Sequence, residues 1–149
     1  MKLKILVGTT GGTAEGVAQA IALDCADLLP AIEVQRMDGL DTATFDDTEA
    51  LYLVCTATHG SGDVPDNAWG LYDALDSQPK FLGHVRYGIV ALGDSSYDTF
   101  CQGGERFDER LQGLGARRVG EVLRLDACAD TLPEAEAVAW ARDWLQRLV

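Results

Sequence analysis

The stretch Ala50–Thr56 reads ALYLVCT, a continuous apolar run, and it leads into the polar, glycine-rich segment 57–63 (ATHGSGD). An apolar run of this length without alternation is typical of a strand that is covered on both faces. Such strands occur in parallel sheets whose neighbouring strands are joined by crossover helices. The stretch therefore predicts the central strand of an α/β fold.

Short apolar runs alternate with longer helical patterns in both directions from this strand. We expect further strands at residues 2–7, 32–37, 87–92 and 118–125, and helices at residues 13–28, 67–75, 100–114 and 133–148. Trp140 and Trp144 lie four residues apart on the last helix and are expected in the core. Because the chain has no internal repeat and no long linker, we expect one α/β domain over residues 1–149, with five parallel strands.

The composition is that of an ordinary globular domain with a strong acidic excess. The 149 residues include 12 basic and 24 acidic ones, which gives a net charge of −12. Such a charge repels nucleic acid and anionic lipid surfaces and favours encounter with basic faces of other proteins. No stretch approaches the roughly 20 apolar residues that a membrane span needs, and the N-terminus does not resemble a signal peptide. We therefore expect a cytoplasmic protein that binds neither nucleic acid nor membranes.

The cysteines form neither a metal-binding nor a disulfide pattern. Cys25, Cys55, Cys101 and Cys128 are widely scattered, include no CxxC pair and accompany two histidines. We therefore expect free thiols, some of them buried as small hydrophobic residues, and no metal site.

Ligands of open α/β sheets bind beyond the carboxyl ends of the strands, where the strand order switches direction. The first such loop, residues 8–15 (GTTGGTAE), opens directly into a helix. Glycines allow close backbone approach, threonines donate hydrogen bonds, and the helix N-terminus offers N–H groups to an anion. The loop is neither GxGxxG nor a Walker loop, and it contains no cation. It therefore predicts a site for a single phosphate group.

Two further loops follow the third and fourth expected strands. The loop after the third strand, residues 56–63 (TATHGSGD), contains glycine and serine around His59 and is able to lie along a flat ring. The loop after the fourth strand, residues 92–101 (LGDSSYDTFC), places Tyr97 where it can stack on an aromatic ligand. Each loop alone could be an ordinary turn. Three such loops at one edge of the sheet are hard to attribute to chance.

At these residues the sequence resembles the flavodoxin family, and the resemblance covers essentially the whole chain. The most specific stretches are residues 58–63 (THGSGD), 92–97 (LGDSSY) and 100–101 (FC), which look closest to the short MioC-type flavodoxins and to the FMN domain of sulfite reductase flavoprotein and cytochrome P450 reductase. The resemblance implies a doubly wound sheet of order 2-1-3-4-5 with helices on both faces, and FMN as cofactor. The fifth strand lacks the long-chain insertion, which implies the short-chain class.

Positions carried over from the family assign the parts of the FMN site. Residues 9–14 would hold the phosphate, residues 58–62 would line one face and the N5 edge of the ring, and Tyr97 would stack on the other face. Asp126 resembles an acidic residue that the reductase group places near the ribityl chain. The full set of expected cofactor-binding residues is Thr9, Thr10, Gly11, Gly12, Thr13, Ala14, Thr56, Ala57, Thr58, His59, Gly60, Ser61, Gly62, Leu92, Gly93, Asp94, Ser95, Tyr97, Asp98, Phe100, Cys101 and Asp126.

Two positions depart from the family pattern. Gly11 stands where relatives commonly have threonine, although Thr10 beside it can replace the donor, and His59 stands where many relatives have tyrosine or tryptophan. A smaller stacking partner and a missing hydroxyl both imply weaker FMN binding.

The resemblance implies a low-potential, one-electron carrier and no catalytic residues. Its donor would be an NADPH-dependent flavoprotein reductase, its acceptor an unidentified redox protein, and the carrier itself a monomer. A flavin-dependent quinone or nitro reductase on the same fold is the alternative, but the sequence offers no spare motif for a substrate or nicotinamide. A plain binding module without FMN also stays open. A phospho-acceptor domain is excluded, because Thr56 stands where that chemistry requires aspartate.

Overall fold

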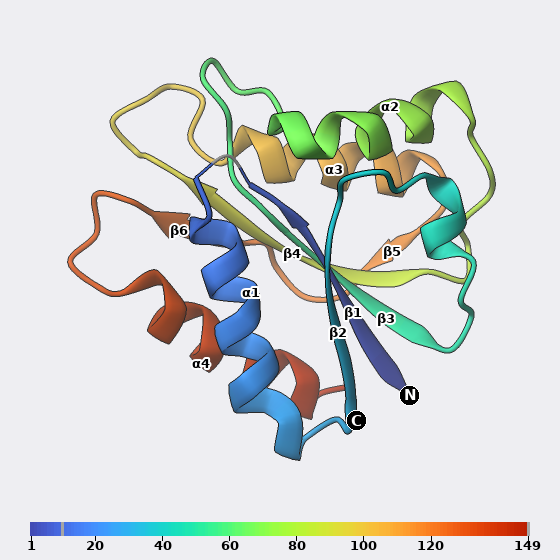
Figure 1. Cartoon of the computed structure of the whole chain (residues 1–149), viewed down its shortest axis with the longest axis horizontal. Coiled ribbons are helices and arrows are strands. Elements are labelled where there is room, and N and C mark those ends of the chain that lie inside the picture. Colours follow the sequence, from blue (N-terminus) through green and yellow to red (C-terminus); the bar gives the residue numbers. More distant parts are fainter. Residues whose placement is uncertain (10, 149) are drawn as a thin grey trace.

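The fold is a parallel sheet with helices on both faces, seen in a computed structural model that describes residues 1–9 and 11–148 (Figure 1). The strands are β1 (Lys2–Gly8), β2 (Ala31–Arg36), β3 (Ala50–Thr56), β4 (Arg86–Gly93), β5 (Arg117–Arg118) and β6 (Leu123–Asp126). All pairs are parallel, and the order β2-β1-β3-β4-β5 confirms the expected order.

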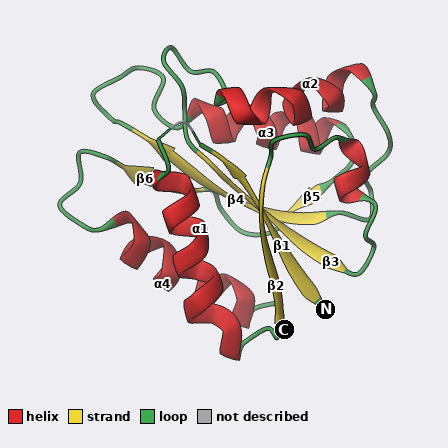
Figure 2. Cartoon of the chain, viewed as in Figure 1, coloured by secondary structure: helices red, strands yellow, loops and turns green. Residues whose placement is uncertain are grey.

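Helices cover both faces of the sheet. They are α1 (Thr13–Asp24), α2 (Trp69–Ser77), α3 (Gln102–Gly113) and α4 (Pro133–Gln146), with short 3₁₀ turns at Cys25–Asp27, Thr42–Phe45 and Asp66–Ala68. Figure 2 shows α1 and α4 together on one face and α2 and α3 on the other. No helix of the described ranges is long and apolar enough to cross a membrane.

The sheet separates two hydrophobic cores, and β3 contributes to both. All seven β3 residues are buried. Because successive side chains of a strand point to opposite faces, Tyr52 and Val54 pack toward α2 and α3, whereas Leu53 and Cys55 pack toward α1 and α4. This burial on both faces is the reason why the β3 sequence is apolar without alternation.

The fifth strand is not the continuous segment 118–125 that the sequence predicts. Two short strands, β5 and β6, pair with the start and the end of β4. Between them Gly120 has a left-handed backbone (φ 76°), and the carbonyl of Val119 accepts a hydrogen bond from Trp144 Nε1 at 2.9 Å. The turn at Gly120 interrupts the ladder, and β6 resumes it where Leu125 enters the core.

Helix boundaries also differ from expectation: α2 lies two residues later than the expected 67–75, because residues 66–68 form a 3₁₀ turn, α3 ends one residue before the expected 114, and α4 ends two residues before the expected 148. The helix expected over 13–28 ends as an α-helix at Asp24 and continues only as a 3₁₀ turn, while the helix expected from residue 100 begins at Gln102. The latter begins late because Cys101 has a left-handed backbone (φ 60°) and serves as its N-cap. Trp144 is buried as expected, whereas Trp140 is half-buried and stacks on it.

Candidate functional site

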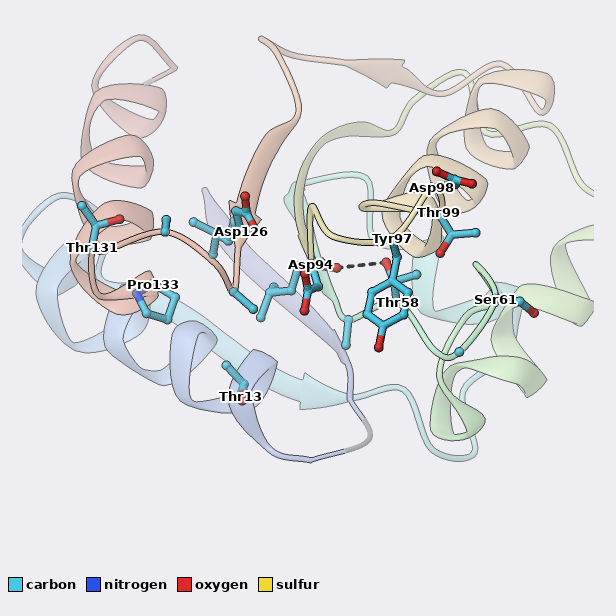
Figure 3. A pocket seen from close by; sticks show the side chains of 17 residues that line it. Thr13, Thr58, Ser61, Asp94, Tyr97, Asp98, Thr99, Asp126, Thr131 and Pro133 are labelled. Atoms are coloured by element: carbon cyan, nitrogen blue, oxygen red, sulfur yellow. Dashed lines mark hydrogen bonds between the residues drawn. The ribbon is translucent and has the colours of Figure 1, made fainter.

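A cleft of about 800 Å³ opens at the carboxyl ends of the strands. Its walls come from the loops after β3, β4 and β6 and from the start of α1, and Figure 3 shows Tyr97 and Thr58 on one side of Asp94, with Thr131 and Pro133 on the other. The residues that line it are Thr13, Ala57, Thr58, Gly60, Ser61, Leu92, Gly93, Asp94, Tyr97, Asp98, Thr99, Leu125, Asp126, Ala127, Ala129, Thr131 and Pro133. Loops from four parts of the sequence therefore meet in one cavity.

The loop after β1 leads to an uncapped helix start at the cleft. Gly12 is the N-cap of α1, with a left-handed backbone (φ 91°), and no side chain among the described residues caps it. Thr9 Oγ1 instead accepts a hydrogen bond from the Gly12 N–H at 2.8 Å, and the Thr9 N–H donates to Asn67 Oδ1 at 2.7 Å. Because the first N–H groups of a helix have no partner within the helix, the start of α1 beside Thr13 is suited to an anion.

One hydroxyl group of the loop after β3 bonds to two other segments. Thr58 Oγ1 donates to the carbonyl of Leu92 at 2.9 Å and accepts from the N–H of Gly103 at 3.1 Å, which joins the loop to the end of β4 and the first turn of α3. A Cβ at Gly103 would collide with the carbonyl oxygen of Ala57, so the helix approaches this closely only because residue 103 is glycine.

The tip of the same loop is a tight turn. The N–H groups of Asp63 and Gly62 both donate to the carbonyl of His59, at 3.0 and 3.1 Å, and Gly60 and Gly62 have left-handed backbones. Gly60 and Ser61 line the cleft. His59 is exposed and does not line it, so the weak stacking partner expected at this position lies outside the cavity wall.

The loop after β4 presents an aromatic ring at the cleft. Tyr97 is 63% exposed although it lines the cleft. Its N–H donates to the carbonyl of Asp94 at 3.1 Å, and the Asp94 carboxylate accepts from the N–H and hydroxyl of Ser96 at 2.9 and 2.5 Å. The exposed ring is available to stack on a flat ligand.

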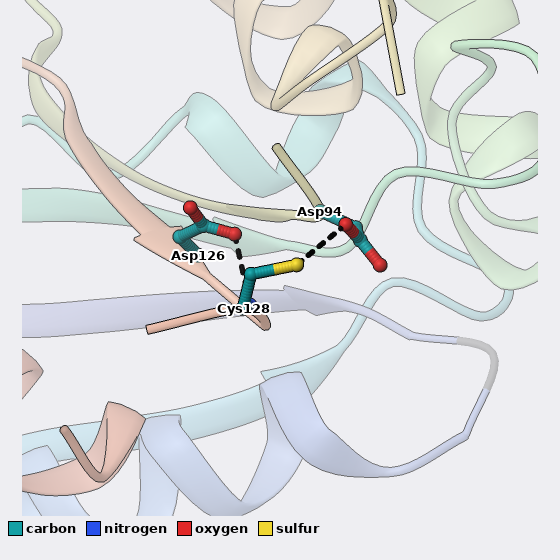
Figure 4. A group of neighbouring side chains, drawn as sticks. All are labelled: Asp94, Asp126 and Cys128. Carbon is teal, nitrogen blue, oxygen red and sulfur yellow. Dashed lines mark hydrogen bonds between the residues drawn. The ribbon is translucent and has the colours of Figure 1, made fainter. Parts of the chain in front are cut away.

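Asp94 and Asp126, which line the cleft, lie next to Cys128 (Figure 4). Hydrogen bonds from Ser96 hold the pKa of Asp94 below its ordinary value, and hydrogen bonds from Ser95 do the same for the pKa of Asp126. The hydrogen bond that Cys128 donates to Asp94 raises the pKa of the thiol. The two carboxylates are therefore ionised at neutral pH and the thiol is protonated.

These three residues are also the one group of three that could ligate a metal within residues 1–9 and 11–148, with their ligand atoms within 4.8 Å of one another. Hydrogen-bond donors of the protein already use an oxygen of each carboxylate. The expectation that the chain holds no metal stays a prediction.

The structure brings half of the expected cofactor-binding residues to the cleft. Those that line it are Thr13, Ala57, Thr58, Gly60, Ser61, Leu92, Gly93, Asp94, Tyr97, Asp98 and Asp126. Thr9, Gly11, Gly12, His59, Gly62 and Ser95 lie in the adjoining loops, whereas Ala14, Thr56, Phe100 and Cys101 are buried or half-buried among core residues. Thr10 lies outside the described residues. Contact of each residue with a cofactor stays a prediction.

The sequence interpretation missed one wall of the cleft. Thr99, Leu125, Ala127, Ala129, Thr131 and Pro133 line it, and all but Thr99 come from the end of β6 and the segment that leads into α4. Apart from Asp126, the lining residues of this segment are apolar residues and one threonine without glycine, which give no signal of a binding loop. The general rule that ligands lie at the carboxyl ends of the strands does apply to this segment.

Three comparisons with known proteins agree with this geometry. The flavodoxin family model matches residues 5–140. Protein MioC of Escherichia coli K12 is 33% identical over 146 residues, which cover 98% of this chain and 97% of MioC. The sulfite reductase [NADPH] flavoprotein alpha-component of Vibrio cholerae is 39% identical over 150 residues, which cover 99% of this chain but 23% of that protein. The solved structure of the C101A mutant of a Pseudomonas aeruginosa flavodoxin superimposes with a TM-score of 0.82, at 37% identity and 99% coverage of both chains. These matches confirm the resemblance read from the three loops.

Proposed function

Because the chain belongs to the flavodoxin family and has FMN as its cofactor, we propose that it carries electrons one at a time, at low potential, between a reductase and acceptor proteins. The observation that carries the proposal is the cleft itself, in which an uncapped helix start and the exposed ring of Tyr97 belong to one cavity. FMN supplies the redox chemistry when it is bound, and the protein sets the potential.

The chemical groups that line the cleft match the parts of FMN. The N–H groups at the start of α1 and the hydroxyl of Thr13 would hold the phosphate without a cation, which suits a monophosphate. The main chain of residues 57–61 would line one face of the ring and Tyr97 the other. A ring held between a glycine-rich loop and a tyrosine would be shielded from water on both faces.

Carboxylates around the cleft support a low potential. Asp94, Asp98 and Asp126 line it, and the pKa values of Asp94 and Asp126 lie below their ordinary values. Fixed negative charge opposes the addition of further negative charge nearby, more strongly where water is partly excluded. The chain itself thereby disfavours the reduced state of a bound group and makes it a stronger reductant.

The proposal extends to the setting in which the protein works. We infer a single domain over residues 1–149 that acts as a monomer in the cytoplasm, where free thiols such as the buried Cys25, Cys55 and Cys101 persist. Its donor would be an NADPH-dependent flavoprotein reductase and its acceptor a redox protein with a basic face. The net charge of −12 supports the second point, because it steers such faces toward the chain.

An anaerobic reductive titration of the purified protein with added FMN tests the proposal. Visible spectra are expected to show two separable one-electron steps. The protein alone is expected not to oxidise NADPH. Reduction in one two-electron step, or rapid NADPH oxidation without a reductase, would instead indicate a flavin-dependent reductase enzyme.

Variants of Tyr97 test the placement of the ring. Tyr97→Phe keeps the π face and is expected to change FMN affinity by less than about threefold, whereas Tyr97→Ala is expected to weaken it about tenfold, since a lost stacking contact costs about 1.5 kcal/mol. Quenching of flavin fluorescence measures both affinities. Equal affinities of the two variants would show that the ring does not stack on the flavin.

A further inference from the structure

One carboxylate oxygen joins the loop of Tyr97 to the segment after β6. Asp126 Oδ1 accepts hydrogen bonds from the N–H of Ser95 at 3.0 Å and from the N–H of Cys128 at 2.9 Å. The thiol of Cys128 in turn donates to Asp94 Oδ1 at 3.1 Å (Figure 4). Two loops that are more than 30 residues apart in sequence are thereby connected in both directions.

The main chain joins the same two segments just before this loop, where the Ala127 N–H donates to the carbonyl of Gly93 at 2.8 Å, but few other hydrogen bonds fix the loop itself. The other hydrogen bonds of residues 94–97 run within the loop, from Ser96 and Tyr97 back to Asp94. Within the described part of the chain, the contacts to Asp126 and Cys128 are the hydrogen bonds that tie residues 94–98 to another segment. The Tyr97 ring is 63% exposed, so core packing does not hold it.

From this connection we propose that Asp126 is a positioning residue, which acts through Ser95 to hold Tyr97 at the wall of the cleft. The inference rests on the proposed function and goes beyond it by giving Asp126 a role other than contact with FMN. A carboxylate that accepts two main-chain N–H bonds makes charge-assisted bonds, which are stronger than neutral ones. The low pKa of Asp126 keeps this acceptor ionised at neutral pH.

Amide hydrogen exchange of the FMN-free protein tests the connection without the cofactor. In Asp126→Ala, the Ser95 and Cys128 amides are expected to exchange about tenfold faster, because both lose their acceptor. Asp126→Asn retains an oxygen acceptor and is expected to keep most of the protection. Asp130→Asn serves as the matched control, because it removes one charge from the same exposed segment, where the Asp130 side chain makes no hydrogen bond to a described residue. Thermal unfolding of each variant establishes that it is folded.

FMN binding then tests positioning. Asp126→Ala is expected to bind FMN about fivefold to tenfold more weakly and to alter the visible circular dichroism of the flavin, which reports the geometry of the tyrosine next to it. Asp126→Asn is expected to restore both. Retained protection of the Ser95 amide in Asp126→Ala would overturn the proposal, as would unchanged affinity and dichroism. If Asp126→Asn bound FMN as weakly as Asp126→Ala although its Ser95 and Cys128 amides kept their protection, charge and not the hydrogen bonds would be responsible, which also overturns it. Failure of the wild-type protein to bind FMN would defeat the proposed function, whereas the exchange rates would still decide whether Asp126 joins the loops.

Discussion

Replacement of Thr58 by valine removes one hydroxyl group while it nearly preserves the shape of the side chain. In the wild-type protein that hydroxyl donates to the carbonyl of Leu92 and accepts from the N–H of Gly103. Valine leaves both main-chain groups without this partner at a half-buried junction. The substitution therefore tests how much of the fold around the cleft depends on a single side chain.

The expected loss can be worked out from the two bonds. The N–H of Gly103 belongs to the first turn of α3, where loss of a side-chain acceptor typically costs about 1 kcal/mol. The carbonyl of Leu92 loses a donor, for about 1 kcal/mol more. The sum of about 2 kcal/mol corresponds to a decrease of about 4–8 °C in the melting temperature of a chain of this size.

Urea unfolding of the FMN-free protein measures this loss, with circular dichroism and fluorescence as two probes of the same transition. Thr99→Val is the matched control, because Thr99 also lines the cleft and its hydroxyl has no hydrogen-bond partner among the described residues. The control is expected to change the free energy of unfolding by less than about 0.5 kcal/mol. If Thr58→Val cost no more than Thr99→Val, the reasoning from the two hydrogen bonds would be refuted.

Two further predictions concern the carboxylates beside Cys128. At pH 8 a thiol reagent is expected to label Cys128 alone, since the other three cysteines are buried. Asp94→Asn is expected to speed the labelling, because it removes the carboxylate that raises the pKa of the Cys128 thiol. An unchanged labelling rate would contradict this role of Asp94. Asp94 and Asp126 have lowered pKa values, so their bonds stabilise the fold above the unfolded pKa of about 3.9 and are lost as the pH falls through the folded pKa values. Urea unfolding at a series of pH values below 4 should therefore show a steeper loss of stability in wild type than in Asp94→Asn/Asp126→Asn, and equal slopes would contradict the pKa shifts.

The sheet could be predicted from the sequence because its strands are buried on both faces. The β3 residues must be apolar without alternation, and this pattern is visible in the chain itself. The division of the last strand was not visible, because it depends on a contact with a distant helix. The Trp144 ring packs over Gly88 and its Nε1–H donates to the Val119 carbonyl. No feature of the sequence near residue 119 indicates this contact.

The cleft could be predicted on the side where the loops have unusual composition. Glycine, threonine and tyrosine after β1, β3 and β4 indicate a binding site in those loops. The wall made by Ala127, Ala129 and Pro133 was missed because small apolar residues are equally common in ordinary connections. Asn67, which bonds to Thr9 in the loop after β1 and to the carbonyl of Val7 in β1, was missed because a polar residue at the expected start of a helix looks like an ordinary helix start.

Thr58 and Asp126 show why polar residues at strand ends are ambiguous in a sequence. Both lie where a ligand is expected, and both were expected to bind it. In the structure, the Thr58 hydroxyl and one oxygen of Asp126 already bind the main chain of neighbouring segments. A residue that holds a loop and a residue that touches a ligand thus occupy similar positions and have similar chemistry. They differ in whether their substitution changes the protein without its ligand or only changes ligand binding. Loss of Thr58 or Asp126 should already change the FMN-free protein, whereas loss of the exposed Tyr97 ring should be felt only when FMN binds.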